Sequence, residues 1–153
     1  TGWRIGYIGA PEFIAKACTK MQGQVTSGAN SIAQRATKAA VEANPSQIKY
    51  MVDAFHKRRD LVFGLMQEIP GFKLTNPEGA FYVFPDVSDY FGKTLRGTEI
   101  KDATDFAMYL LAEANVATVT GDAFGSPNCL RLSYATSEEQ LIEAIKRIKD
   151  AVS

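Results

Sequence analysis

The sequence predicts an α/β protein in which helices cover a small sheet. In its second part, short runs of β-branched and apolar residues alternate with segments of helical period. The 153 residues are 46% apolar and 22% charged, which is typical of a globular chain that buries a real core. There is no internal repeat and no low-complexity segment.

In the first part, residues 3–9 look like a buried strand, so we expect a strand there. Pro11 is placed to begin a short amphipathic helix, because proline is preorganised for a first helical turn. Residues 23–30 form a polar loop, and the alanine-rich residues 31–43 predict a second helix. A chain that opens directly on a buried strand is also expected to be cut from a larger protein.

The second part begins after Asn44-Pro45. Ser46 is expected to cap a long helix that reaches about Ile69, where Pro70-Gly71 stops it. The remaining predicted elements are strands at residues 72–74, 80–84, 116–119 and 130–134, a helix over residues 101–114, and a terminal helix after the capping box at residues 136–139.

Charge and composition exclude several classes of partner. Seventeen Lys and Arg balance seventeen Asp and Glu, so no net charge attracts the chain to nucleic acid or to an anionic membrane. The longest apolar runs, such as residues 81–84, are far too short to cross a bilayer. Cys18 and Cys129 lack metal-ligand spacing and are expected to be buried thiols. These features predict a cytoplasmic protein without a metal site.

Arg4 is the first residue that could carry chemistry. It stands among Trp3, Ile5, Tyr7 and Ile8, with glycines at positions 2, 6 and 9. A permanently charged guanidinium in apolar company needs an anion, and a phosphate approached through a glycine-rich backbone would satisfy it. The alternative is an ion pair with a carboxylate of the same fold.

Arg131 is the second candidate. Strand alternation places Leu130, Leu132 and Tyr134 on one face, and it places Arg131 on the other with Cys129 and Ser133. An arginine on a rigid strand suits bidentate binding of a carboxylate. The alternative is a surface or salt-bridge arginine.

The segment Gly121-Asp122-Ala123-Phe124-Gly125 is a glycine-containing loop. Its glycines allow a tight backbone. Phe124 is therefore expected to form an apolar wall beside Arg131. Elsewhere, Trp3, Phe55 and Phe106 look like core residues, and His56 looks like a solvated surface residue.

Four segments taken in series resemble the class I aminotransferases, and most closely the bacterial-type aspartate aminotransferases of fold type I. They are Thr1-Gly2-Trp3-Arg4-Ile5-Gly6-Tyr7, Gly79-Ala80-Phe81-Tyr82, Gly121-Asp122-Ala123-Phe124-Gly125 and Leu130-Arg131-Leu132-Ser133-Tyr134-Ala135. The resemblance in order and spacing covers the whole chain. It implies an enzyme that exchanges an amino group between an amino acid, with aspartate favoured, and a 2-oxo acid, using pyridoxal phosphate.

The resemblance assigns roles residue by residue. It implies that Arg4 binds the phosphate of pyridoxal phosphate and that Arg131 binds the substrate's α-carboxylate. Phe124 would line the substrate pocket. Thr26 and Ser27 match a loop that reaches toward the partner subunit's site in the homodimers of this family.

The sequence departs from the family pattern at its start. In the family, the catalytic lysine that forms a Schiff base with the cofactor lies a few residues before the Thr-Gly-Trp-Arg segment. The matching position would fall before Thr1, and no lysine of this chain matches it. We therefore expect the 153 residues alone to be inactive and unable to hold the cofactor.

The resemblance also implies a division of the chain. Residues 1–45 would be the tail of the large pyridoxal-phosphate-binding domain, and residues 46–153 would be the linking helix and the small C-terminal domain. Residues 1–44 would lack most of their sheet, so we expect them to be disordered, rearranged or packed against another copy.

Three alternatives to the aspartate enzyme remain open. In some aspartate enzymes an Arg in the loop that corresponds to residues 23–30 recognises the distal carboxylate. Residues 23–30 of this chain contain no Arg, so an aminotransferase for another amino acid is the first alternative. An aminotransferase-like sensor domain of a transcription regulator is the second. A plain structural domain, in which Arg4 and Arg131 pair with acids, is the third, and the four motifs in series disfavour it.

Overall fold

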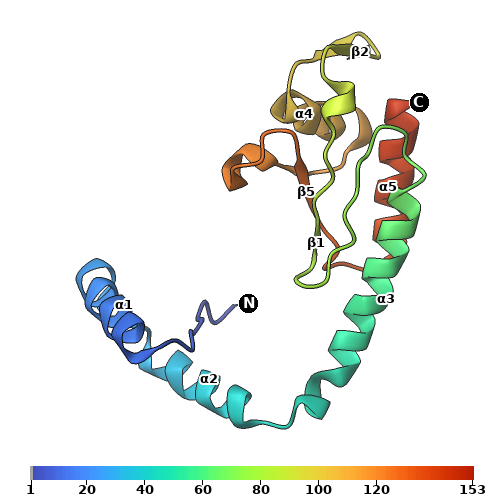
Figure 1. Cartoon of the computed structure of the whole chain (residues 1–153). Helices are drawn as coiled ribbons and strands as arrows, with labels where there is room; N and C mark the ends of the chain where they lie inside the picture. The colour runs from blue at the N-terminus through green and yellow to red at the C-terminus, as the bar shows by residue number, and fades with distance from the viewer. Residues whose placement is uncertain (1) are drawn as a thin grey trace. The chain divides into compact units, whose positions relative to one another are not determined.

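The computed structural model describes residues 2–153, which fold as two compact units that divide between Lys49 and Tyr50 (Figure 1). Figure 1 colours the chain from blue at the N-terminus to red at the C-terminus. No helix in the described part of the chain is both long enough and apolar enough to cross a membrane.

The first unit is built from helices. It contains α1 (Glu12–Val25), α2 (Ser31–Glu42) and the short helix η1 (Pro45–Ile48). The Asn30 side chain caps α2 by accepting hydrogen bonds from the amides of Ile32 and Ala33, at 2.9 and 3.1 Å. Helix α1 runs past Gly23, where a loop was expected, because a single helical glycine costs only about 1 kcal/mol.

The expected strand over residues 3–9 is absent. Residues 4–11 have no regular structure, and the side chains of Trp3, Tyr7 and Ile8 are 63%, 73% and 64% exposed. A strand requires a second strand to receive its backbone hydrogen bonds, and residues 2–49 contain none. The prediction that Trp3 is a core residue is therefore wrong.

Two long helices frame the second unit. They are α3 (Lys49–Met66) and α5 (Glu138–Val152), which lie side by side in Figure 1. Lys57 pairs with Glu138 and Glu68 pairs with Lys149, both at 2.9 Å. Glu68 directly follows the end of α3, and the two pairs are equally spaced along the chain, from 57 to 68 and from 138 to 149, so the helices run in the same direction.

A three-stranded antiparallel sheet lies at the centre of this unit, in the order β1 (Tyr82–Val83), β5 (Leu130–Ser133) and β4 (Val119–Thr120). Tyr82 pairs with Ser133, and Val119 pairs with Arg131. Strands β1 and β5 are shorter than predicted, and β4 begins only at Val119, the last residue of the strand expected at residues 116–119. The strand expected at residues 72–74 is reduced to a single bridge from Lys73 to Asp86, which in turn bridges to Cys129.

Helix α4 (Ala103–Ala114) starts at Asp102, whose carboxylate accepts hydrogen bonds from the amides of Thr104 and Asp105 at 2.8 and 2.9 Å. The predicted helix at residues 101–114 is therefore confirmed. The terminal helix is confirmed as well, because Ser137 caps α5 through the amide of Gln140.

A two-stranded hairpin was not predicted. It pairs β2 (Lys93–Leu95) with β3 (Thr98–Ile100), and its turn holds Arg96 and Gly97 at φ values of 46° and 86°. Two left-handed residues match the twist of hairpin strands. Arg96-Gly97 is a weak sequence signal for this turn, because the first position usually carries Asn or Asp.

The core of the second unit is aromatic around Phe106, which is fully buried. Its ring stacks on Tyr90 at 4.7 Å and meets Phe72 edge-on at 6.2 Å between ring centres. Phe55 is half-buried and packs on this core.

Cys129 is half-buried, but Cys18 is exposed, so the prediction of two buried thiols is wrong for Cys18. Cys18 lies on helix α1, in which no described residue is buried.

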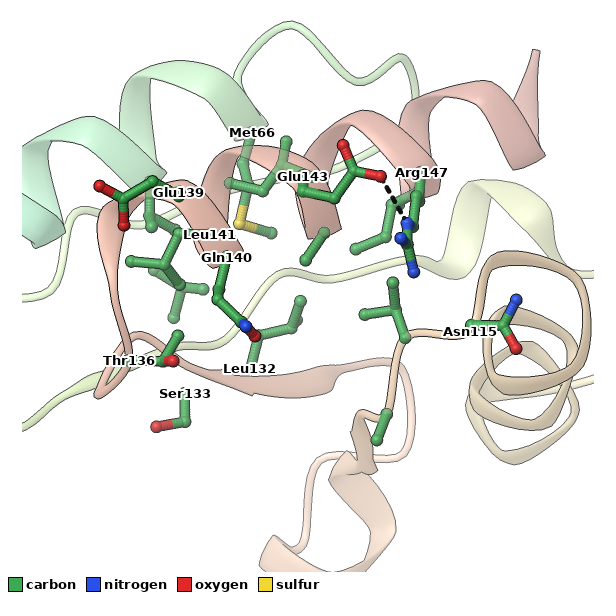
Figure 2. Close-up of a pocket in the computed structure, with 17 residues that line it drawn as sticks. Met66, Asn115, Leu132, Ser133, Thr136, Glu139, Gln140, Leu141, Glu143 and Arg147 are labelled. Atoms are coloured by element: carbon green, nitrogen blue, oxygen red, sulfur yellow. Dashed lines mark hydrogen bonds and ion pairs between the residues drawn. The ribbon is translucent and has the colours of Figure 1, made fainter.

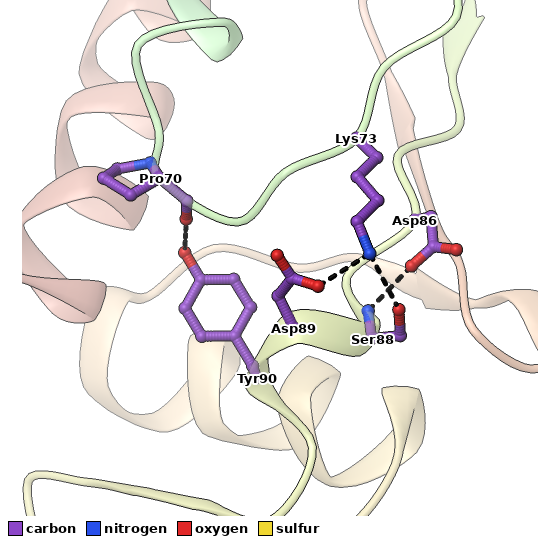
Figure 3. Close-up of polar contacts among 6 residues, drawn as sticks. All are labelled: Pro70, Lys73, Asp86, Ser88, Asp89 and Tyr90. Carbon is purple, nitrogen blue, oxygen red and sulfur yellow. Dashed lines mark hydrogen bonds and ion pairs between the residues drawn. The ribbon is translucent and has the colours of Figure 1, made fainter.

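A polar cluster holds the chain that links α3 to β1 (Figure 3). The Lys73 ammonium group donates to Asp89 at 2.6 Å, and the backbone amide of Ser88 donates to Asp86 at 2.8 Å. The hydrogen bond that Lys73 donates to Asp89 raises the pKa of Lys73, and hydrogen bonds from Ser88 lower the pKa of Asp86. The short helix η2 (Ser88–Tyr90) lies in this cluster.

Candidate functional site

Arg131 occupies the middle of the sheet, on the central strand β5. Its guanidinium carbon lies over two aromatic rings, at 4.4 Å from the centre of Tyr82 and 4.3 Å from the centre of Phe124. Leu130 and Tyr134 are buried while Ser133 is exposed, which confirms the predicted alternation along the strand. Arg131 itself is half-buried.

No carboxylate neutralises this arginine within residues 2–153. Neither an ion pair nor a hydrogen bond to Asp or Glu involves Arg131. The alternative in which Arg131 is a salt-bridge residue is therefore wrong for the described chain. Aromatic rings carry no carboxylate, so these contacts leave the N–H donors of the guanidinium available for an anion.

The loop after β4 determines where Phe124 lies. It forms a short helix, η3 (Gly121–Phe124), and returns to β5 through a hydrogen bond of 2.7 Å from the Gly121 amide to the Cys129 carbonyl. A Cβ atom at position 121 would come within 2.1 Å of the Ser126 carbonyl oxygen. Gly125 ends η3 in the left-handed region, with φ of 73°. The expected contact of Phe124 with Arg131 is confirmed.

Tyr82 is brought to Arg131 by the strand on the other side of β5. The preceding Ala80 has φ of 61°, and its carbonyl accepts a hydrogen bond of 3.1 Å from the Tyr134 hydroxyl. The amide of Tyr134 donates to the Phe81 carbonyl at 2.9 Å. The sequence alone did not predict that Tyr82 contacts Arg131, although Tyr82 belongs to one of the four motifs.

Arg4 lies in the first unit and is exposed rather than embedded in apolar side chains. Its backbone has φ of 50°, and it lines an open groove of about 930 Å³ between residues 3–7 and α2, together with Thr37 and Val41. Within residues 2–153 it has no carboxylate partner. The predicted apolar burial is wrong, because residues 3–9 form no sheet in this unit.

Thr26 and Ser27 end helix α1. Thr26 is the C-cap residue, its amide donates to the Gln22 carbonyl at 3.0 Å, and its hydroxyl accepts from the Gln22 side chain. Ser27 has φ of 66°, and both residues are exposed. They do not line the groove that contains Arg4.

A separate cavity of about 540 Å³ lies between α3, α5 and the sheet (Figure 2). Its floor consists of buried core side chains such as Met66 and Leu141. At its rim, Arg147 is paired with Glu143 at 2.8 Å, and neither Arg131 nor Phe124 lines it. Because the arginine at the rim is already neutralised, we place the candidate site at Arg131.

The thiol of Cys129 directly precedes the strand that carries Arg131. Burial raises the pKa of the Cys129 thiol, and the nearby Asp86 raises it further, so this thiol is a poor nucleophile at neutral pH. Among residues 2–153, no group of three or more His, Cys, Asp or Glu side chains could hold a metal ion.

Comparison with known proteins identifies the family of the chain. The family model described as aminotransferase class I and II matches residues 1–148. Among curated proteins, the aspartate aminotransferase of Rhizobium meliloti is 46% identical over 152 residues, which are 99% of this chain and 37% of that protein. A bifunctional aspartate aminotransferase and glutamate/aspartate-prephenate aminotransferase of Petunia hybrida is 45% identical, and the match covers 99% of this chain and 33% of that protein.

Solved structures give the same result. The aspartate aminotransferase of Rhizobium meliloti matches with a TM-score of 0.82 at 44% identity, over 99% of this chain and 38% of that one. The aromatic aminotransferase of Pyrococcus horikoshii matches with a TM-score of 0.77 at 32% identity, over 98% and 39%. The chain thus spans little more than a third of these proteins and has part of their fold, the fold type I α/β architecture. It belongs to the class I and II aminotransferase family.

Proposed function

We propose that this chain is part of an aspartate aminotransferase, which transfers an amino group between an amino acid and a 2-oxo acid with pyridoxal phosphate as cofactor. The observation that carries the proposal is the Arg131 guanidinium, which lies over two rings and has no carboxylate partner in residues 2–153. The names of the relatives support aspartate as the amino acid.

In this proposal Arg131 binds the α-carboxylate of the substrate. Its planar fork forms two parallel N–H···O bonds, which fix the carboxylate and thereby orient the α-carbon. Phe124 places an apolar ring 4.3 Å from the guanidinium carbon, which lowers the local polarity and strengthens the charge-assisted bonds. The strand position of Arg131 keeps this geometry rigid.

The donor set of the first unit fits the phosphate of pyridoxal phosphate. Arg4 has no carboxylate partner in residues 2–153, and it lies in an open groove beside Gly6, where no side chain hinders approach to the backbone. When bound, pyridoxal phosphate supplies the electron sink for the reaction. Thr26 and Ser27 would lie toward the partner subunit's site in a homodimer.

The 153 residues alone are proposed to be inactive, because the catalytic lysine of the family would fall outside them. The test compares this chain with a version extended upstream to the full gene, each titrated with pyridoxal phosphate and followed by absorbance. The proposal expects only the extended protein to gain a borohydride-reducible band that changes when an amino acid is added. If neither protein binds the cofactor, the sensor or structural alternative replaces the enzyme.

A second experiment tests Arg131 directly. In the extended protein, Arg131→Ala should lower kcat/KM for aspartate more than tenfold, which corresponds to more than about 1.4 kcal/mol, while cofactor binding is retained. Arg147→Ala is the matched control, because Arg147 forms only an exposed ion pair with Glu143 one helical turn away. Unchanged kinetics for Arg131→Ala would overturn the assignment.

The choice of amino acid has one competing candidate. The match to the aromatic aminotransferase of Pyrococcus horikoshii favours an aromatic amino acid, and the wall formed by Phe124 and Phe84, with ring centres 6.1 Å apart, is compatible with it. Comparing kcat/KM for aspartate and phenylalanine in the extended protein distinguishes the two. A larger value for phenylalanine would reassign the substrate.

A further inference from the structure

The Tyr82 ring holds the second contact with Arg131. The guanidinium carbon lies 4.4 Å from the ring centre, well inside the roughly 6 Å within which a cation is attracted to an aromatic face. Tyr82 belongs to β1, which is hydrogen-bonded to β5 on one side, while Phe124 follows β4 on the other side. The two rings therefore reach Arg131 from opposite neighbours of its strand.

A long, flexible arginine side chain needs such contacts to stay in one conformation. Burying and ordering an arginine costs up to about 2 kcal/mol of rotamer entropy. No carboxylate in residues 2–153 restrains Arg131, so the two rings are the contacts that hold its guanidinium. Phe124 is half exposed, at 48%, and is carried by a short loop helix, whereas Tyr82 lies in the sheet itself.

The backbone around Tyr82 is built to hold this position. Tyr82 pairs with Ser133 across the β1–β5 ladder, and the left-handed Ala80 is tied to Tyr134 by a hydrogen bond of 3.1 Å. A non-glycine residue with φ of 61° costs about 1 kcal/mol or more, and such strain persists only where the surrounding structure demands it. The strained turn sets the point at which β1 begins.

We propose that Tyr82 is a positioning residue that acts through Arg131: its ring face fixes the guanidinium by a cation–π contact, so that the in-plane N–H donors present a preformed fork to a carboxylate. This inference rests on the proposed function of Arg131. A preformed fork improves carboxylate binding because less conformational freedom is lost when the ligand binds.

The test measures the affinity of the extended, cofactor-loaded protein for succinate by calorimetry. Succinate is a dicarboxylate without an amino group, so it binds without reacting. A series of variants is compared, in which position 82 is tyrosine, phenylalanine or a phenylalanine with an increasing number of ring fluorines. Fluorination weakens the negative charge on the ring face and nearly keeps the size of the ring. Tyr82→Phe should bind succinate like the unmodified protein, and affinity should then fall stepwise to about tenfold weaker for the most fluorinated ring.

The kinetic readout separates positioning from general damage. Along the same series the KM for aspartate should rise in parallel with the succinate dissociation constant, while kcat stays nearly constant. The same fluorinated residues at Phe91, a half-buried ring that is not one of the two rings in contact with the Arg131 guanidinium, should leave both values unchanged.

Two results would overturn the inference, and they are distinguishable. If Arg131→Ala weakens succinate binding but the position 82 series is flat, Tyr82 has only a packing role and the proposed function stands. If Arg131→Ala leaves succinate binding unchanged, both the proposed function and the role of Tyr82 fail.

Discussion

The backbone amide of Gly121 donates a hydrogen bond of 2.7 Å to the carbonyl of Cys129, and this bond closes the loop that carries Phe124 to Arg131. The closure is tight enough that position 121 has no room for a side chain. The fold of a few loop residues thus determines one wall of the candidate carboxylate site.

Gly121→Ala should destabilise the protein for this reason. The added Cβ would lie 2.1 Å from the Ser126 carbonyl oxygen and 2.6 Å from that of Cys129, and both are backbone atoms that cannot move alone. We expect a loss of about 3 kcal/mol in the free energy of unfolding, measured by urea denaturation. Gly64→Ala on helix α3 is the control. The added Cβ would contact no neighbouring side chain, so this variant should raise the free energy of unfolding by up to about 1 kcal/mol. Equal midpoints for the two variants would contradict the prediction.

Phe106→Ala should remove the centre of the aromatic core. The side chain is fully buried and touches the rings of Tyr90, Phe72 and Tyr109. The expected loss is about 3 to 5 kcal/mol in the free energy of unfolding of the second unit. Met108→Ala, on the same helix but 60% exposed, should change it by less than about 1 kcal/mol. A small effect at Phe106 would show that the core repacks.

Tyr90 should make the protein less stable at high pH. Burial, with a further contribution from Asp89, raises the pKa of Tyr90 to about 12, against 10.0 for an ordinary tyrosine. Above pH 10 the unfolded chain loses the phenol proton while the folded chain keeps it, so stability falls as the pH rises from about 10 to 12. The shift of about two pKa units limits the loss to roughly 3 kcal/mol.

The measurement is the free energy of unfolding by urea at pH 8, 10 and 11. Tyr90→Phe should flatten part of this pH dependence and lower stability at pH 8 by about 1 kcal/mol, because the hydrogen bond from Tyr90 to the Pro70 carbonyl is lost. An unchanged slope in the variant would mean that Tyr109 and Tyr134, whose pKa values burial also raises, cause the loss.

The two units should differ strongly in hydrogen exchange. In the first unit only Ala33 is buried among the described residues, whereas the second unit contains a continuous core that includes Val62, Ile100 and Leu130. Amides of α1 should therefore exchange much faster than those of α4 when the chain is followed by mass spectrometry. Equal protection of α1 and α4 would indicate that the first unit is covered, by a second copy or by ligand.

Local signals in the sequence predicted several elements well. The helical period over residues 101–114 corresponds to α4, and the alternation around Arg131 corresponds to β5. Phe124 was expected beside Arg131, and it lies there. These features depend on contacts between residues close in the chain, which sequence pattern records directly.

Other predictions failed where partners distant in sequence decide the outcome. Residues 3–9 have strand-like composition, but strand formation depends on a neighbouring strand, which the described residues 2–49 do not provide. The β2–β3 hairpin was missed because its turn residues, Arg96 and Gly97, carry no strong signal. The contact of Tyr82 with Arg131 spans the β1–β5 ladder, so no local pattern records it.

The sequence by itself determined the fold class, the family resemblance and the choice of Arg4 and Arg131 as candidate anion-binding residues, because these rest on residue types and on short-range periodicity. Only the tertiary structure decided that Arg131 lacks a carboxylate partner in residues 2–153 and lies over the rings of Tyr82 and Phe124. It also decided that Arg4 is exposed. The physical reason is that the burial and pairing of a side chain depend on contacts between segments that are distant in the sequence. Strand register and loop closure determine which of these segments come into contact.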